Sequence, residues 1–581
     1  MPNAPKWLQE TFSSSVSGSN SSVAPDLISN ASIAWGYNIC NRGGRPKTRP
    51  YFRYRMALPN GHVQGASYFS IQGGMGVAMI DGYLYRLRIG AQESTTDTAE
   101  SIPLDFQNYP NAKQVWMCQT VESIVIQNFI DNPIIYDGST AKRSDPVAFG
   151  VPRGRQMAYG NGRLWVATNE YTLAAGDIRT GDAGSELQFT ETNYLTGGGT
   201  FSFPSPITAM KFMPTTGTSD YGALLVTGQE GVYSVRADVT SRDTWSQIPS
   251  FISTILRHSG CAGQNSIAEV NQDLYWRDPE GGIRSVRSSL ADESGAGNSP
   301  ISYEVNRITE YDSRVLLPYC PAINFNNRLL MGGSPCINYY GGASWKSLIA
   351  LDFAPVSTMA GKASPEYDGE WSGLNITHMF TGNIAGKQRA FVISCSDLGA
   401  NSLWEIMQDT DGQIADRAID CSLSELVDIR PTAYFETSRR DFGQINYRKI
   451  LRRIDLYIAE LLGRADVTIE YRADASTQWM VAGTYTFCAQ VNDPLVAGET
   501  THVWKNLNAQ HRSQVKTFSL PTVRDSITRR ATNVGFQFQF RVSWKGHMLV
   551  HRVVAHAEPL DQEQYASPLD IEDVCVANNV T

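Results

Sequence analysis

A short unit of two apolar, β-rich runs joined by a polar turn returns along this chain and most restricts what it can fold into. One copy runs from Val77 to Gly90, and a longer one runs from Val115 to Gly138. Two β-rich runs around a short polar turn predict a β-hairpin. Further copies begin at Met157, Ala223, Ile267, Ile323 and Ala390.

The spacing of these hairpins indicates how they are arranged. Copies that recur every roughly 40 to 65 residues are typical of the radial blades of a β-propeller. The 49 Gly, 27 Pro and 26 Tyr residues among 581 favour strands joined by many turns over helices. We therefore expect an all-β fold, with a β-propeller of roughly six or seven blades over residues 51–415.

The pattern changes in the last third of the chain. The segments that begin at Ile450 and Val534 alternate apolar and polar residues. This period of two is the signature of half-buried antiparallel strands. Gly546 is expected to end one strand of the second segment in a turn. We predict a separate β-sandwich over residues 416–560, followed by an acidic C-terminal tail over residues 561–581.

The chain begins differently. Residues 1–25 are rich in Ser, Asn and Pro, and Ser13 to Ser22 is nearly all small polar residues. Such a segment cannot offset the entropy of ordering by its own contacts, so it predicts a flexible arm. A basic, turn-rich segment with an Arg-Pro pair follows. We therefore treat residues 1–50 as an N-terminal arm and Arg-Pro turn.

Composition excludes several classes of protein. With 42% hydrophobic and 18% charged residues, the chain can bury a sizeable core and is not disordered. A net charge of −8 argues against gripping nucleic acid through a large basic surface, although DNA could pass an acidic wall without sticking. No apolar stretch of membrane-spanning or signal-peptide length is present. Nine scattered Cys without CxxC spacing indicate mainly reduced thiols in a cytosol, and a few disulfides stay an open alternative.

The densest basic run contains the candidate contact residues. They are Arg42, Arg45, Lys47, Arg49 and Arg53, with Arg55 beyond and Tyr51, Phe52 and Tyr54 interleaved. Basic and aromatic side chains together could contact a nucleic-acid backbone. They could equally anchor the arm on an acidic neighbouring subunit or adaptor, or form a solvated strand edge that deters aggregation. A second run, from Arg439 to Arg453, has the same three interpretations.

Motifs for catalysis, cofactors or metals are not evident. His547 and His551 have HxxxH spacing, but in a strand they lie roughly 13 Å apart, too far for one ion. Asp137, Asp273 and Asp278 stand in turn-like contexts where a carboxylate caps the backbone. The Gly197–Gly199 triplet is followed by strand-like sequence rather than a helix, so a phosphate loop is not expected. We expect no catalytic residues, no cofactor and no metal site, and no enzyme.

One segment and several later ones resemble a known family. Residues 26–52 read DLISNASIAWGYNICNRGGRPKTRPYF, with Asn41, Gly43 or Gly44, Arg49, Pro50 and Phe52 as the matching positions. This arrangement resembles the start of the tail nozzle proteins of short-tailed bacteriophages, also called tail tubular protein B or DNA-stabilisation proteins. The stretches at Ser123, Gly162 and Leu348 are similar to blade strands of that family, and the stretch at Ala174 is similar to the Gly-Asp turn that follows one such strand. Tyr51 follows Pro50 where the family often has Gly, so the local turn is expected to differ.

The resemblance implies a structural role. It implies a homo-oligomeric ring, a hexamer, that forms the distal tail tube of the virion below the portal and a tail adaptor protein. Such a ring retains genomic DNA in its lumen and later conducts it out. Tail fibres are a further candidate partner, and assembly would take place in the host cytoplasm. Two other readings stay open: a propeller hydrolase acting on host glycans, and a receptor-binding protein that recognises host sugars through exposed Trp and Tyr.

Overall fold

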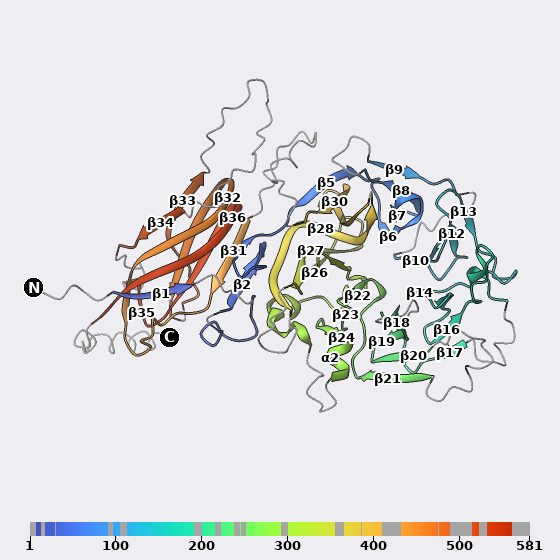
Figure 1. Cartoon of the computed structure of the whole chain (residues 1–581), viewed down its shortest axis with the longest axis horizontal. Coiled ribbons are helices and arrows are strands. Elements are labelled where there is room, and N and C mark those ends of the chain that lie inside the picture. Colours follow the sequence, from blue (N-terminus) through green and yellow to red (C-terminus); the bar gives the residue numbers. More distant parts are fainter. Residues whose placement is uncertain are drawn as a thin grey trace, which may run out of the picture. The chain divides into compact units, whose positions relative to one another are not determined.

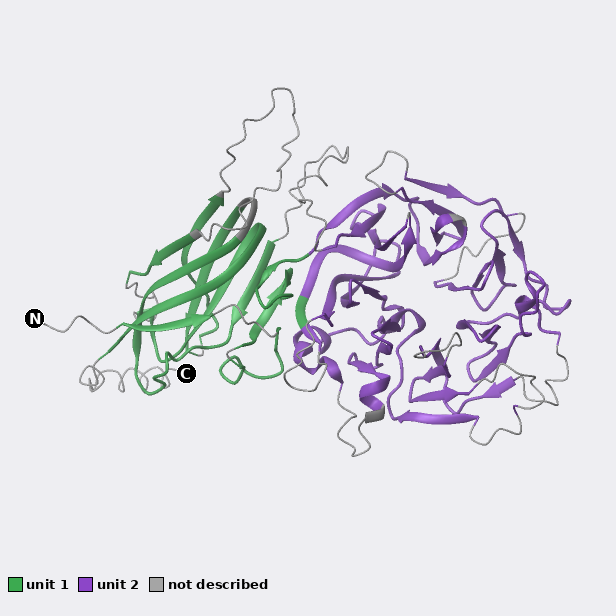
Figure 2. Cartoon of the chain, viewed as in Figure 1, with its two compact units in different colours: residues 1–49, 367–369, 428–581 green, residues 50–366, 370–427 purple. Residues whose placement is uncertain are grey.

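The protein folds into two compact units, which we describe separately (Figure 2). Unit 1 comprises residues 1–49, 367–369 and 428–581, and unit 2 comprises residues 50–366 and 370–427. The computed structural model describes residues 7–12, 18–29, 31–90, 97–104, 113–190, 200–214, 222–236, 245, 251–291, 300–354, 365–384, 386–408, 432–474, 476–488, 514–521 and 531–560. The predicted tail, residues 561–581, lies outside these ranges.

Small antiparallel sheets follow one another along unit 2, in a ring that Figures 1 and 2 show. The first sheet comprises β6 (Val63–Phe69), β7 (Met75–Ile80), β8 (Tyr83–Arg88) and β9 (Thr98–Ser101). The second comprises β10 (Trp116–Gln119), β11 (Ile124–Gln127), β12 (Ile134–Tyr136) and β13 (Ala141–Arg143). The third comprises β14 (Met157–Gly160), β15 (Arg163–Ala167), β16 (Thr172–Ala175) and β17 (Thr200–Ser202).

The remaining strands of unit 2 complete the ring. The fourth sheet comprises β18 (Ile207–Phe212), β19 (Leu224–Gly228), β20 (Gly231–Val235) and β21 (Ile252–Arg257). The fifth comprises β22 (Ala268–Val270), β23 (Asp273–Arg277) and β24 (Ile283–Ser285), followed by the short helices α2 (Val286–Ala291) and α3 (Asn306–Thr309). Two more antiparallel groups follow. One comprises β25 (Ala322–Phe325), β26 (Arg328–Ile337) and β27 (Ala343–Asp352). The other comprises β28 (Glu366–Ile384), β29 (Lys387–Cys395), β30 (Asn401–Ile406) and β5 (Phe52–Ala57).

The β-propeller prediction is confirmed, and its blade count differs from the expected number. Every hairpin predicted from the sequence pairs as an antiparallel ladder. Five separate small sheets are present among the described residues of unit 2, fewer than the roughly six or seven expected from the repeats. The strands β25 to β30 and β5 also form antiparallel ladders, but they are not counted among these five separate sheets. A local hairpin pattern does not show where a sheet ends.

Apolar side chains fill the space between successive sheets. Phe69 and Ile124 belong to a core shared by the first and second sheets, and Trp165 and Met210 to a core shared by the third and fourth. Trp165 stacks on Trp245 with ring centroids 5.6 Å apart. Val125 and Leu164 belong to a core shared by the second and third sheets, and Leu225 and Leu274 to one shared by the fourth and fifth. Such packing between successive sheets is expected for wedge-like blades.

The ring closes by joining its first strand to its last strands. β5 precedes the first sheet in the chain, yet it pairs with β30, about 350 residues later, from Ser402↔Ala57 to Ile406↔Phe52. Met56 and Leu403 of this pair share a core with Ile80 of the first sheet. The two ends of the ring are thus held by hydrogen bonds and by apolar packing together.

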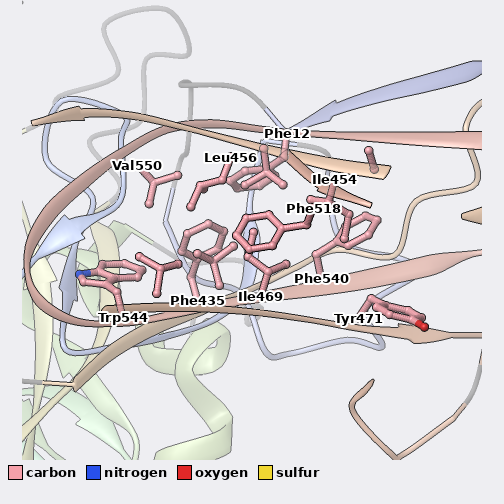
Figure 3. Packing of buried hydrophobic residues seen from close by; sticks show 14 of the residues in the cluster. Phe12, Phe435, Ile454, Leu456, Ile469, Tyr471, Phe518, Phe540, Trp544 and Val550 are labelled. Atoms are coloured by element: carbon pink, nitrogen blue, oxygen red, sulfur yellow. The ribbon is translucent and has the colours of Figure 1, made fainter. Parts of the chain in front are cut away.

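Unit 1 is a sandwich of antiparallel strands, as predicted. Its strands are β1 (Leu8–Phe12), β2 (Ile33–Tyr37), β3 (Ile39–Cys40), β4 (Lys47–Thr48), β31 (Thr432–Thr437), β32 (Lys449–Ala473), β33 (Met480–Cys488), β34 (Gln514–Ser519), β35 (Val534–Gly535) and β36 (Phe538–Pro559). The long strands β32 and β36 pair along most of their length. Figure 3 shows Phe12, Phe435, Leu456 and Phe540 pointing into the space between layers of strands.

Two sequence expectations are corrected in unit 1. The N-terminal segment expected as an arm contributes strands β1 and β2, because Leu8, Phe12 and Ile33 pack on the unit 1 core despite their Ser-rich surroundings. Gly546 does not end a strand. It lies inside β36 with a φ of 123°, next to the register shift between Leu462 and Asp466 on β32. Glycine permits this conformation, so the strand bends and continues.

Candidate functional site

The candidate basic run does not form one continuous surface. Arg42, Arg45, Lys47 and Arg49 belong to unit 1, whereas Arg53 belongs to unit 2. The Arg49 side chain is buried, and its Nε donates a hydrogen bond of 2.8 Å to Asn38 Oδ1. Arg53 is engaged by Glu405, with 2.8 Å between Nη2 and Oε2. These two residues therefore already serve internal contacts.

The part of the run before Arg49 lies beside basic residues from the end of the chain. Lys47 of β4 pairs with Leu549 of β36, which brings the segment of Arg45 next to that strand. Burial, and then the charges of Arg45 and Arg552, lower the pKa of His551. Arg552 is exposed and lies over the Tyr457 ring at 4.0 Å. Arg45 and Arg552 thus bring two positive charges near His551 on unit 1, and we call these three residues the basic surface.

The second basic run is used within unit 1. Lys449 is fully buried, and its Nζ donates to the carbonyl oxygens of Gln444, Tyr447 and Phe536. Ion pairs join Arg439 to Asp26, Arg440 to Glu10, Arg452 to Glu558 and Arg453 to Asp455. Because a carboxylate accompanies each of these four arginines, this run offers little net charge to a phosphate backbone.

The carboxylates considered for catalysis cap turns. Asp137 accepts hydrogen bonds from the backbone N–H groups of Ser139 and Thr140, which lower its pKa against the opposing effect of burial. Asp278 accepts from Gly282 N–H, and Asp273 accepts from Leu274 N–H. Asp137 and Asp278 therefore cap turns as predicted, whereas Asp273 begins strand β23 and also accepts from the Arg287 N–H of α2.

A cavity in unit 2 was missed by sequence reasoning. It has a volume of about 190 Å³ and lies where β6, β10, β25 and β28 meet the turn Gln264–Ser266. His378, Asn265 and Ser67 supply polar groups to its lining. Burial, and then nearby His62, lower the pKa of His378 to about 3, so its ring is neutral at physiological pH. Nδ1 of His378 has no hydrogen-bond partner within the described part of the chain. The sequence carried no signal for it, since one His in a strand is a common residue.

An aromatic surface on unit 1 was also missed. Arg472 and Arg541 lie over the Trp479 ring at 4.4 and 4.2 Å. Arg541 also lies over Tyr434, whose ring stacks on Tyr37 with centroids 5.0 Å apart. Glu436 pairs with Arg541 at 2.7 Å, so the charge there is largely balanced. Flat rings flanked by guanidinium groups can stack on sugars or bases. The alternation of apolar and polar residues in β36 predicted that one face of this strand points outward, but it did not predict which residues lie beside that face.

The described ranges offer neither a metal-binding cluster nor a membrane-spanning helix. No three side chains of His, Cys, Asp or Glu gather there in a manner that could hold a metal ion. Within the same residues, no helix could serve as a membrane span.

Comparison with known proteins bears on the fold only. No protein-family model matches the chain, and no curated protein matches it. Similar solved structures include the mitotic checkpoint complex, with 10% identity, 62% of this chain and 96% of that chain covered, and a TM-score of 0.34. YCF48 bound to D1 peptide has 11% identity, coverages of 62% and 97%, and a TM-score of 0.34. BamB from Moraxella catarrhalis has 11% identity, coverages of 64% and 96%, and a TM-score of 0.30. Likenesses at this level say nothing about function.

Proposed function

We propose that this chain is a structural virion protein that forms the distal tail tube, or nozzle, of a short-tailed phage. Several copies form a ring, a hexamer by family resemblance, attached to a tail adaptor protein. The ring retains genomic DNA in its lumen and conducts it out after adsorption. The protein is then part of the virion tail, it is assembled in the host cytoplasm, and it has no catalytic role.

The closure of unit 2 is the observation that carries this proposal. The strand that enters the ring, β5, is hydrogen-bonded to the strand that leaves it, β30. Arg53 and Arg55 of β5 reinforce the same two strands through ion pairs with Glu405 of β30. A propeller whose first and last strands are hydrogen-bonded to each other cannot unfold from one end alone. Unit 2 therefore suits the wall of a tube that bears the pressure of packaged DNA.

The charge distribution is compatible with a DNA conduit. The chain carries a formal charge of −8, which repels phosphate and limits sticking to DNA. Arginines of the second basic run, such as Arg452 and Arg453, are paired with carboxylates. The basic surface instead holds the positive charges of Arg45 and Arg552 on unit 1. We assign that surface to anchoring on an acidic neighbouring copy or adaptor, with DNA contact as the competing assignment.

Electron microscopy of the purified protein, alone and with its adaptor, tests the proposal. We expect ring-shaped particles with a central lumen, at least when the adaptor is present. A persistently monomeric particle that associates with no ring partner would refute the nozzle function. Co-purification with a portal and capsid from infected cells is the second expected result.

A receptor-binding role is the alternative that a specific observation favours. Trp479 and Tyr434 form part of an aromatic surface, and Tyr339 of unit 2 is 66% exposed. Aromatic faces of this kind stack on sugar rings. Purified protein that binds host cells, and loses binding on Trp479→Ala, would support this alternative. Release of sugars from host-surface glycan would instead indicate the hydrolase reading.

A further inference from the structure

The first strand of the chain lies at an edge of the unit 1 sheet. β1 pairs with the end of β36 over five residues, from Leu8↔Ala557 to Phe12↔Val553. Among the described residues, the strand register of β1 is with β36. β1 therefore covers a stretch of β36 that would otherwise expose unpaired backbone N–H and C=O groups.

Side chains make the position of β1 specific. Phe12 is buried, stacks on Phe435 at 5.5 Å, and lies under the Arg440 guanidinium at 5.7 Å. Glu10 pairs with Arg440 at 3.5 Å, and burial raises the pKa of Glu10 and lowers that of Arg440. At the other end, Trp7 lies under Arg453 at 5.9 Å. We call the groove that receives residues 7–12, formed by β36, β31 and these arginines, the β1 groove.

The chain is fixed again shortly after β1. Ser19 N–H donates to Tyr367 O at 2.8 Å, and Asn20 N–H donates to Ile33 O at 2.8 Å. Between Phe12 and Gly18 the sequence is SSSVS. A fully extended chain from Phe12 to Gly18 spans at most about 20 Å.

We propose that in the assembled protein β1 docks into the β1 groove of a second copy of this chain. The groove is complementary to residues 7–12 of this sequence, and a second copy offers the same residues. The contacts of Phe12, Glu10 and Trp7 can then be made equally in the groove of the second copy. Exchange of an identical element between copies is therefore a low-cost route to association.

The exchange supplies a directional link between copies. Each copy donates β1 through one surface and accepts a strand at another, which is a heterologous contact and closes into a ring when the rotation allows. The receiving groove must begin within about 20 Å of Gly18 of the donor copy. The proposal rests on the proposed function only in that the copies assemble.

Cysteine cross-linking of differently tagged copies tests the exchange. Thr11 lies opposite Val554, so Thr11→Cys on one copy and Val554→Cys on another can form a disulfide only if β1 crosses between copies. The two variants are co-expressed in the full-length chain, and the disulfide-linked peptides are identified by mass spectrometry, which separates them from the nine native cysteines. The matched control is the pair Thr432→Cys and Lys545→Cys, which lie opposite each other on β31 and β36.

The expected result is a disulfide between Thr11→Cys and Val554→Cys of different copies, with no such link for the control pair. The exchange is overturned if the two single variants never link, while a chain that carries both substitutions links within itself in every assembled fraction. Rings with only internal links would reject the exchange and leave the nozzle function standing. Non-ring oligomers with links between copies would support the exchange and reject the nozzle function.

Discussion

Arg389 and Glu405 form a two-point ion pair across β29 and β30, with Nε–Oε1 at 2.6 Å and Nη2–Oε2 at 2.8 Å. Glu405 also accepts from Arg53 and Arg55, and Arg55 reaches Asp97 at 2.7 Å. Burial alone would raise the pKa of Glu405, but hydrogen bonds and charges from Arg389 and Arg53 outweigh it and lower this pKa. The carboxylate therefore stays ionised at the point where the ring of unit 2 closes.

Replacing Glu405 should weaken unit 2 strongly. Glu405→Ala leaves the buried Arg389 and the half-buried Arg53 without this carboxylate, and breaking a buried pair costs about 3–5 kcal/mol. Urea unfolding measures the loss. The control is Glu170→Ala, which removes an exposed pair with Arg155 and should cost under about 1 kcal/mol. Equal losses of unfolding free energy for the two variants would mean that Glu405 does not secure the pairing of β5 with β30.

Because the folded-state pKa of Glu405 is lowered, its contribution to stability should fade as acid protonates it.

Phe12→Ala should release β1 without unfolding the chain. The substitution removes a buried ring, which in a core costs about 3–5 kcal/mol and at a frayed edge costs less. Hydrogen exchange should then show lost protection at those residues of Val553–Ala557 whose N–H groups bond to β1, while the N–H groups that bond to β32 stay protected. Thr11→Ala, at an exposed position of the same strand, is the control and should leave protection unchanged. Unaltered hydrogen exchange of β36 in Phe12→Ala would show that the Phe12 side chain does not hold β1 in place.

His378 should make the protein less stable in mild acid. Its pKa is about 3 in the folded state and about 6.5 when unfolded, so between these values the unfolded state binds the extra proton. Stability therefore falls as pH drops below 6.5, by at most about 1.4 kcal/mol for each pH unit. His378→Gln should flatten this dependence in melting curves recorded from pH 7.5 to 5. His258→Asn, at an exposed histidine with φ 64°, should retain the slope. An unchanged slope in His378→Gln would contradict the assignment.

Lys449 should be needed for the fold of unit 1. Its ammonium group satisfies three backbone carbonyl groups from Gln444, Tyr447 and Phe536. Lys449→Met keeps the apolar stem but leaves those carbonyl groups without their donor, at an expected cost of about 3 kcal/mol. Thermal unfolding with a probe in unit 1 measures this. Lys142→Met, on the exposed side of β13, serves as the comparison and should change stability by under about 0.5 kcal/mol. A similar melting point for both variants would count against the role.

The basic surface should govern salt-dependent association. Replacing Arg45 and Arg552 together by Ala removes two positive charges without touching a buried ion pair among the described residues. If the surface anchors on an acidic protein, adaptor or self-association should weaken at low salt while DNA retention is unchanged. If the basic surface contacts DNA, the slope of log binding constant against log salt concentration should decrease by the contribution of about two phosphate contacts. Sedimentation and DNA-binding assays at several salt concentrations decide, with Arg155→Ala as the control. No change in either assay would leave only the solvated-edge interpretation.

Local patterns were sufficient to predict the hairpins but not their closure. The turn between β7 and β8 and the alternation in β32 are signals within about 25 residues, where the period of two is directly visible. The pairing of β5 with β30 and of β1 with β36 joins segments more than 300 residues apart. Alternation shows that a strand has a buried face, but it does not name the neighbouring strand. For this reason β1 and β2 were expected in an arm and lie in unit 1.

For charged residues too, the sequence did not predict which distant side chains they contact. Arg49 and Arg53 look alike in a basic run, and only the folded chain brings Asn38 and Glu405 to them. The cavity beside His378 could not be foreseen, because its lining comes from strands β6, β10, β25 and β28. By contrast, Asp137 was predictable as a cap, since its partners Ser139 and Thr140 are the next residues in the turn.

The split of unit 1 between the two ends of the chain sets an order of events during synthesis. Residues up to Arg49 leave the ribosome first, but β31 to β36 follow only after residue 428. At ordinary translation speed this interval lasts roughly 20 to 75 seconds. Unit 2 can fold meanwhile, whereas Ile33 and Trp35 must wait without their partners. A chaperone that shields this early segment would therefore raise the yield of folded protein more than one acting on the nascent C-terminus.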